Sequence, residues 1–146
     1  MSAQPILALI RELARCYQAF EAYSAPHIRS MGLTPCQFDI IATLGNTDGL
    51  SFRELGGKTL ITKGTLTGVV ERLVEKKLVR RVVDANDGRS QIVSLTEQGN
   101  LLFADIFPRH LQYLNEAFAA LSADEIKEMQ VKLKRLGSVF NHSGRW

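Results

Sequence analysis

The sequence lacks any apolar run long enough to cross a membrane. A membrane-spanning helix needs about 18 or more consecutive apolar residues, and no apolar stretch of this chain approaches that length. The N-terminus also lacks a basic leader followed by an apolar stretch and a cleavage site. We therefore expect a cytoplasmic protein with no membrane partner.

The chain is also poor in the residues that build metal sites. It has two cysteines and three histidines. Cys16 and Cys36 do not have metal-ligand spacing, and His27, His110 and His142 are dispersed along the sequence. A nucleophile–base motif and a glycine-rich phosphate loop are missing as well. We expect no metal, no cofactor and no enzymatic activity, and we interpret both cysteines as buried free thiols.

The composition is that of one folded domain of ordinary size. The 146 residues are 45% hydrophobic and 23% charged, which suits a globular chain with a real core. The net charge of +3 does not by itself indicate a polyanionic partner. However, residues 51–95 contain nine Lys or Arg and five acidic residues, whereas the rest of the chain has nine bases and ten acids. A positive excess confined to the central third is what a nucleic-acid surface requires.

Three capping boxes mark the starts of helices. In this motif a Ser or Thr is followed three residues later by Glu or Gln, and the two side chains satisfy free backbone N–H groups. The motif occurs at Thr34–Gln37, Ser51–Glu54 and Ser122–Glu125. With the apolar periodicity, it predicts helices near residues 5–30, 34–46, 51–58, 62–77, 97–120 and 122–140. Strands are predicted at residues 79–83 and 91–95.

Residues 51–77 have the spacing of a helix-turn-helix. A short helix runs into a Gly-Gly pair, and a second helix is predicted to begin with Thr62 as its N-cap residue. One face of the second helix is apolar and is expected to face the core; it consists of Leu66, Val69, Val70, Leu73 and Val74. The opposite face is small and hydroxyl-bearing near its start, which suits a helix that enters the major groove of DNA end-on.

An ordinary amphipathic surface helix is the alternative interpretation of this segment. Gly64 and Gly68 argue against this interpretation, because glycines on the exposed face lower the stability of the helix. Close approach of another molecule would explain them, and so would a local irregularity of the helix. The two predicted strands follow directly and join through Asn86-Asp87-Gly88, residues that tolerate positive φ, so the hairpin displays Arg89 to solvent. Helix-turn-helix and hairpin together predict a winged helix.

Three segments carry a resemblance to a known family. The stretch from Asp87 to Gly99, DGRSQIVSLTEQG, resembles the wing signature of the MarR (multiple antibiotic resistance regulator) family of transcription factors. The segments GLTPCQFDIIATL and LTGVVERLVEKKLVRRVVD are similar to family segments in order and spacing. The resemblance covers residues 30–100, and the flanking helices match by pattern.

The resemblance implies a mainly α fold with a small β-hairpin. It places a winged helix-turn-helix DNA-binding region at residues 34–95 of the single 1–146 chain, between helical dimerisation segments at residues 1–33 and 96–146. It implies a regulator that binds double-stranded DNA, by family default a repressor. In the family the wing arginine enters the minor groove and the nearby aspartate holds the wing, and these roles fall to Arg89 and Asp87.

The resemblance also assigns residues to the major groove and the DNA backbone. The major groove would be lined by Thr62, Lys63, Gly64, Thr65, Thr67 and Arg72. The DNA backbone would be contacted by Ser51 and Arg53 at the start of the preceding helix. Many relatives carry a basic or larger polar residue where this chain has Gly68, so the operator is not inferred by analogy.

Apolar residues recur along both ends of the chain. The N-terminal set is Ile6, Ile10, Leu13, Tyr17 and Phe20. The C-terminal set is Leu111, Leu114, Phe118, Leu121, Ile126, Met129, Leu133, Leu136 and Phe140. A monomer of this size would struggle to cover both sets, and the family forms a homodimer through its terminal helices on a pseudo-palindromic site. Packing within the chain is the alternative for part of each set.

Regulation is inferred from the resemblance alone. Family members often respond to a small anionic or aromatic effector between the dimer helices and the winged helix, and the corresponding residues here are Tyr23, His27, Arg29 and Phe38. Ordinary packing or surface exposure is the alternative for each. Another branch of the family senses peroxides through a cysteine on the first helix, where this chain has Cys16. A winged helix that binds protein instead of DNA is the alternative from a different functional class.

Overall fold

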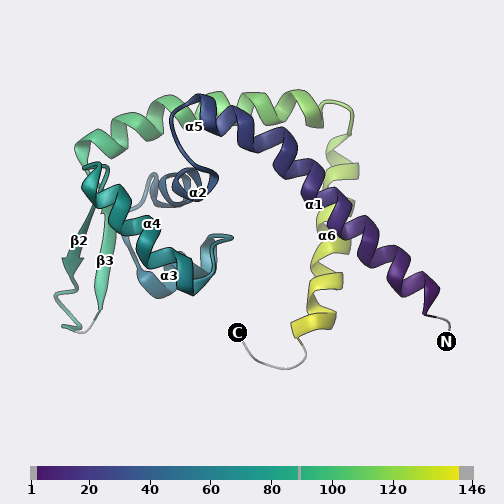
Figure 1. The fold of residues 1–146 in the computed structure, drawn as a ribbon, viewed down its shortest axis with the longest axis horizontal. Helices are drawn as coiled ribbons and strands as arrows, with labels where there is room; N and C mark the ends of the chain where they lie inside the picture. The colour runs from purple at the N-terminus through teal and green to yellow at the C-terminus, as the bar shows by residue number, and fades with distance from the viewer. Residues whose placement is uncertain (1–2, 89, 142–146) are drawn as a thin grey trace. The chain divides into compact units, whose positions relative to one another are not determined.

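The fold is mainly helical with a small antiparallel sheet, as the sequence predicts. The computed structural model describes residues 3–88 and 90–141. The helices shown in Figure 1 are α1 (Gln4–Ser30), α2 (Pro35–Leu44), α3 (Phe52–Lys58), α4 (Lys63–Glu75), α5 (Glu97–Phe118) and α6 (Ala123–Phe140). The strands are β1 (Leu50–Ser51), β2 (Val79–Val83) and β3 (Gln91–Leu95). The chain divides into two compact units, and the division falls within α5 after Leu111.

The three predicted capping boxes are confirmed. The Thr34, Ser51 and Ser122 side chains each accept a hydrogen bond from the backbone N–H three residues later, at 3.1–3.2 Å. The return bonds, from the backbone N–H of each cap residue to Gln37, Glu54 or Glu125, measure 3.1 Å. These bonds fix where α2, α3 and α6 begin, since each satisfies donors that have no partner inside the helix.

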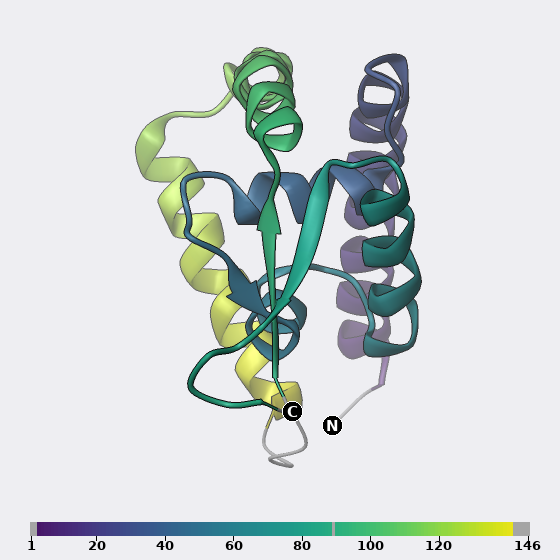
Figure 2. The same ribbon diagram turned by 90° about the vertical axis from the view of Figure 1, so that its left-hand side faces the viewer.

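A short strand that the sequence pattern does not predict completes the sheet. β3 lies between β1 and β2, and both pairs are antiparallel. Leu50 and Ser51 pair with Val93 and Ile92, which ties the segment before α3 to the hairpin. Figure 2 shows β3 leading directly into α5, with the loop of the hairpin at the opposite end of the strands.

In the hairpin loop, Asn86, Asp87 and Gly88 tolerate positive φ, but none of them adopts it. Among the described residues, positive φ occurs at Gly32, Asn46, Gly49 and Lys77. The loop is longer than a two-residue turn, so hydrogen bonds can bend the backbone instead. The Asn86 N–H donates to the Asp84 carboxylate at 3.0 Å, and the Ser90 N–H donates to the Asp87 carbonyl oxygen at 3.0 Å.

The core of the first unit lies among α2, α3, α4, the sheet and the first part of α5. Its fully buried side chains are Ile40, Ile41, Leu44, Leu55, Val70, Leu73, Val79, Val93 and Ile106. The predicted apolar stripe of α4 is largely correct, because Leu66, Val70 and Leu73 are buried and Val69 packs against them. The prediction is wrong for Val74, which is 37% exposed. Val74 lies at the edge of the apolar stripe, although Leu73 beside it is fully buried.

The apolar sets at the two ends of the chain are largely exposed. On α1, Ile6, Ile10 and Tyr17 are each about half exposed, and only Ser24 and Ile28 of that helix are buried. In the second unit, α6 lies wholly within the described range and has no buried residue. Its exposed apolar side chains include Ile126, Met129, Leu133 and Phe140. Within residues 3–88 and 90–141, no helix combines the length and apolarity needed to cross a membrane.

Candidate nucleic-acid interface

The turn between α3 and α4 is anchored to the core on both sides. Thr59 and Ile61 are each only 8% exposed. The Thr59 hydroxyl donates to the Leu55 carbonyl at 2.8 Å, and the Leu60 N–H donates to the Asp39 carboxylate of α2 at 2.9 Å. Burial raises the pKa of Asp39, while the hydrogen bonds it accepts from Leu60 and Thr43 oppose that shift. The anchored turn gives α4 a defined starting direction.

The residues predicted to line the major groove lie together on the exposed side of α4. They are Thr62, Lys63, Gly64, Thr65, Thr67 and Arg72, and all six are exposed. The opposite side of the helix is held by Leu66, Val70 and Leu73, which are at most 3% exposed. The fold therefore presents one polar helix face to solvent and fixes it from behind.

Thr62 occupies the N-cap position of α4 as predicted, but its side chain makes no capping hydrogen bond. Its hydroxyl instead donates to the hydroxyl of Thr65 at 3.2 Å, one turn into the helix. The hydroxyls of Thr62 and Thr65 and the ammonium group of Lys63 thus surround the start of α4. The positive end of the helix dipole lies at the same place, which favours an anionic partner such as phosphate.

The two glycines on this face are not required by packing within the chain. A Cβ atom built on Gly64 or on Gly68 meets no heavy atom within 4 Å. Each glycine costs about 1 kcal/mol of helix stability relative to alanine. The α-helix also runs without interruption from Lys63 to Glu75, so a local irregularity does not explain them. The space around both glycines is open, as close approach of another molecule would require.

An ion pair links α4 to the sheet. The Arg81 guanidinium of β2 lies 3.9 Å from the Glu71 carboxylate of α4. On the neighbouring position of β2, the Arg80 side chain donates to the Ser94 hydroxyl of β3 at 3.3 Å. A partly exposed ion pair of this length adds little stability. The ion pair places Arg81 beside the exposed face of α4, whereas Arg80, the preceding residue of β2, points to the opposite face of the sheet.

The remaining predicted DNA contacts fall on α3 and the hairpin loop. Arg53 is exposed on the first turn of α3, whereas Ser51 is half-buried and its hydroxyl accepts the capping bond from Glu54. Asp87 is exposed and accepts a hydrogen bond from the Ser90 hydroxyl at 3.2 Å, a contact within the loop. Arg89 lies outside the described residues, so its minor-groove role stays a prediction.

Two of the four predicted effector residues meet around a histidine that the sequence reasoning did not select. His110 of α5 is 3% exposed. Its Nδ1 lies 2.9 Å from Nδ1 of His27, and the two rings stack with centroids 5.2 Å apart. The rings of Phe38 and His110 meet edge to face, with their centroids 4.8 Å apart. The Ser24 hydroxyl lies 3.0 Å from His110 Nε2. This histidine cluster joins α1, α2 and α5.

The pKa of His110 is lowered, first by burial and second by the nearby charge of His27. A hydrogen bond between two Nδ1 atoms requires that one of them carries the proton and the other does not. The cluster can therefore hold either ring as the donor, but it does not accommodate two charged rings. The histidines that the sequence presents as dispersed thus include one directly contacting pair.

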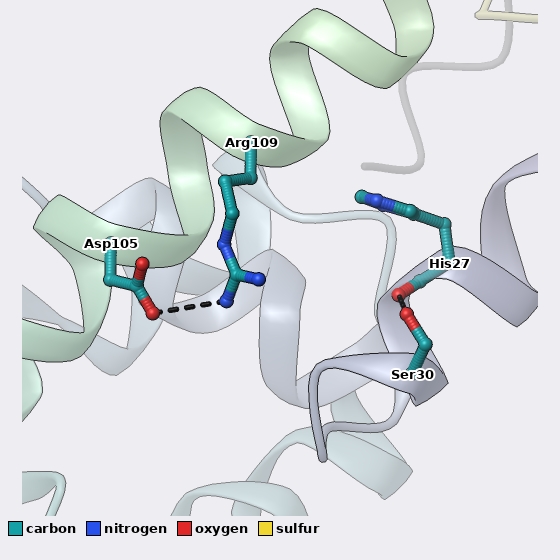
Figure 3. A network of polar contacts seen from close by, with 4 residues as sticks. All are labelled: His27, Ser30, Asp105 and Arg109. Carbon is teal, nitrogen blue, oxygen red and sulfur yellow. Dashed lines mark hydrogen bonds and ion pairs between the residues drawn. The ribbon is translucent and has the colours of Figure 1, made fainter.

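The other two predicted effector residues are placed differently. Tyr23 is half-buried on α1, one turn before His27, and Arg29 is exposed at the end of the same helix. Figure 3 shows the surroundings of His27: the Ser30 hydroxyl donates to its carbonyl oxygen at 2.6 Å. On α5, the figure shows Arg109 donating to the Asp105 carboxylate at 3.0 Å. Arg29 is not part of the histidine cluster.

The exposure of the two cysteines differs from the prediction. Both thiols are free, but the expectation of burial is wrong: Cys16 is exposed and Cys36 is half-buried. Cys16 lies on α1 before Ser24, the first buried residue of that helix. In the part of the chain that the structure describes, no group of three or more His, Cys, Asp or Glu side chains is arranged to hold a metal ion.

Comparison with known proteins agrees with this geometry. A model of the MarR family matches residues 31–90. The regulator MhqR of Bacillus subtilis, named as an HTH-type transcriptional regulator, is 32% identical over 90% of both chains. The structure of BpsR of Bordetella bronchiseptica, whose DNA binding is regulated by 6-hydroxynicotinic acid, has a TM-score of 0.77 and 28% identity, and covers 89% of this chain and 98% of BpsR. NadR in complex with 4-hydroxyphenylacetate has a TM-score of 0.73 and 25% identity, and covers 86% of this chain and 89% of NadR.

Proposed function

Because this chain belongs to the MarR family of transcriptional regulators, we propose that it is a ligand-responsive repressor that binds a pseudo-palindromic operator as a homodimer. The observation that carries the proposal is the exposed polar face of α4. That face combines hydroxyls and a lysine at the start of the helix with the unhindered Gly64 and Gly68, and the other side of the helix is fixed in the core. Such a face fits the major groove of DNA.

On DNA, α4 lies in the major groove and the hairpin lies against the adjacent minor groove. Lys63 and Arg53 contact phosphates, which positions the protein without reading sequence. Thr65, Thr67 and Arg72 reach base edges, since hydroxyl and guanidinium groups can donate to the acceptors of the major groove. Arg89 enters the minor groove, and Asp87 holds the loop through the hydroxyl of Ser90.

Two copies of the chain associate through their terminal helices. The support is the exposed apolar side chains of α1 and α6, which include Ile10, Phe20 and Leu133 at 40–60% exposure. Large apolar side chains that recur in exposed positions along a helix favour an interaction site. A twofold dimer places two copies of α4 about one DNA turn apart, at roughly 34–36 Å, which matches a pseudo-palindrome. Repression follows when the bound dimer occupies a promoter.

The effector is a small aromatic acid that binds beside the histidine cluster. BpsR and NadR are associated with 6-hydroxynicotinic acid and 4-hydroxyphenylacetate, and both compounds combine an aromatic ring with an acid group. In this chain, Phe38 and the stacked His27 supply aromatic surface, while Tyr23 and Arg29 supply a hydroxyl and a positive charge nearby on α1. A ligand that moves α1 relative to α5 would change the separation of the two recognition helices.

The test is DNA binding followed by fluorescence anisotropy. The probe is a duplex selected by the wild-type protein from a randomised pool. Arg89→Ala is expected to weaken binding by about 1–3 kcal/mol, and Lys127→Ala, which removes one positive charge from α6, is expected to leave it unchanged. The opposite outcome, selection of no duplex or indifference to Arg89, would favour the alternative of a winged helix that binds a protein partner.

A second arm tests the effector class. Both 4-hydroxyphenylacetate and 6-hydroxynicotinate are added to the protein–DNA complex, with phenol as an aromatic control that lacks the acid group. The acids are expected to lower DNA affinity in the wild type and to act more weakly on Phe38→Ala. Thiol sensing is tested by adding hydrogen peroxide to the same complex. If peroxide releases the DNA and Cys16→Ser abolishes that release, the protein is a redox sensor and the small-acid effector is wrong.

A further inference from the structure

Leu60, in the turn between α3 and α4, has the highest exposed fraction of any large hydrophobic side chain in the described residues, at 78%. A single exposed leucine is common on protein surfaces and needs no explanation by itself. Its surroundings distinguish it, because they hold the backbone of this residue while leaving its side chain in solvent.

The turn gives Leu60 a fixed outward direction. Its N–H donates to the half-buried carboxylate of Asp39 at 2.9 Å. Its two neighbours, Thr59 and Ile61, are buried, and the Thr59 hydroxyl is bonded to Leu55. Folding the leucine inward would require one of these neighbours to leave the core. A side chain presented on an already ordered backbone loses little further freedom when it meets a partner.

The position of Leu60 identifies the partner. It lies two residues before Thr62, the N-cap of α4, at the end of the helix whose exposed residues begin with Lys63 and Thr65. A basic and hydroxyl-bearing surface is unsuited to an apolar protein partner, but it suits DNA. In the major groove the one apolar group on the base edges is the C5-methyl of thymine. A leucine at this place has no donor for phosphate, and the thymine methyl is the apolar group of a base edge that it can contact.

We propose that Leu60 is a specificity-determining residue that contacts the C5-methyl of a thymine in each half of the operator. The inference rests on the proposed DNA-binding function. It adds an apolar base contact to the hydrogen bonds proposed for α4. Because the methyl groups of Thr65 and Thr67 can also meet thymine, the test pairs each loss of a thymine methyl with a substitution of Leu60.

Replacing thymine by deoxyuridine removes only that methyl group and tests the contact directly. A duplex selected by the wild-type protein is prepared with each thymine replaced singly by deoxyuridine, and affinities are measured by anisotropy for wild type, Leu60→Ala and Leu101→Ala. Leu101 of α5 is the matched control, because it is another strongly exposed leucine, at 68%. Since both side chains are exposed, neither substitution removes core packing.

One thymine in each half-site is expected to show the coupling. There, deoxyuridine weakens wild-type and Leu101→Ala binding by about fourfold, which corresponds to the transfer of one methylene from water. Leu60→Ala binds the two duplexes equally at that position and retains the other deoxyuridine effects. The inference is overturned if Leu60→Ala keeps every deoxyuridine effect of the wild type. Failure of the wild type to select any duplex would overturn the proposed function together with the inference.

Discussion

Gly99 near the start of α5 should not tolerate even a methyl group. A Cβ atom built at this position overlaps the carbonyl oxygen of Leu78 and lies 3.1 Å from its carbonyl carbon. That carbonyl cannot easily move, because it accepts a hydrogen bond from the Thr96 N–H at 3.0 Å. Gly99 itself is buried and donates its N–H to the Thr96 hydroxyl at 3.1 Å. The contact joins α5 to the residue that precedes β2.

The sign of Gly99→Ala follows from two opposing terms. Alanine in place of glycine within a helix contributes about 1 kcal/mol of stability. Forcing an extra methyl group into packed surroundings costs about 1–3 kcal/mol, and the upper end applies where the obstacle is a hydrogen-bonded backbone rather than a flexible side chain. The free energy of unfolding should therefore fall by about 2 kcal/mol.

Urea unfolding followed by circular dichroism measures this change, at one fixed protein concentration because association would otherwise shift the midpoint. Gly68→Ala is the matched control: a Cβ there meets nothing within 4 Å, so the same substitution should add about 1 kcal/mol. A midpoint for Gly99→Ala equal to or above that of the wild type would refute the steric reasoning.

Three further predictions concern DNA binding, pH and association. Gly68→Ala should lower affinity for a selected duplex although it stabilises the fold, and unchanged affinity in anisotropy would show that DNA does not approach this position. The lowered pKa of His110 means that the unfolded chain takes up its proton first as pH falls below the usual value of 6.5; urea midpoints should therefore be higher at pH 7.5 than at pH 5.5, with a smaller difference in His110→Gln. Equal differences in the two proteins would contradict that account. Ile10→Glu should convert a dimer to a monomer in analytical ultracentrifugation, and a dimer that persists would place the interface elsewhere.

Local signals explain why the helices could be predicted from sequence. Each capping box joins residues only three apart, so Thr34 and Gln37 determine the start of α2 without reference to the rest of the fold. The apolar spacing of Leu66, Val70 and Leu73 likewise reports the buried face of α4. The exposed face, with its candidate DNA contacts, follows from the same spacing.

Features that depend on distant partners could not be predicted in this way. β1 contains two residues, too few to show any alternation, and it exists through pairing of Leu50 with Val93. His27 and His110 are 83 residues apart, and their contact depends on how α1 and α5 pack within the first unit. The hairpin loop bends where the Asp84 carboxylate accepts a hydrogen bond from the Asn86 N–H. The residue types Asn86 and Gly88 alone do not predict this bond.

The most direct test of the central claim is the salt dependence of DNA binding by the intact protein. For a regulator that neutralises phosphates, the logarithm of the binding constant falls linearly with the logarithm of salt concentration, by about 0.9 for each contact. Lys63→Ala should reduce this slope by about 2 in a dimer, one contact from each copy, whereas Lys127→Ala should not change it. A steep slope that depends on Lys63 supports DNA recognition through α4. A flat slope, or one indifferent to Lys63, would contradict it.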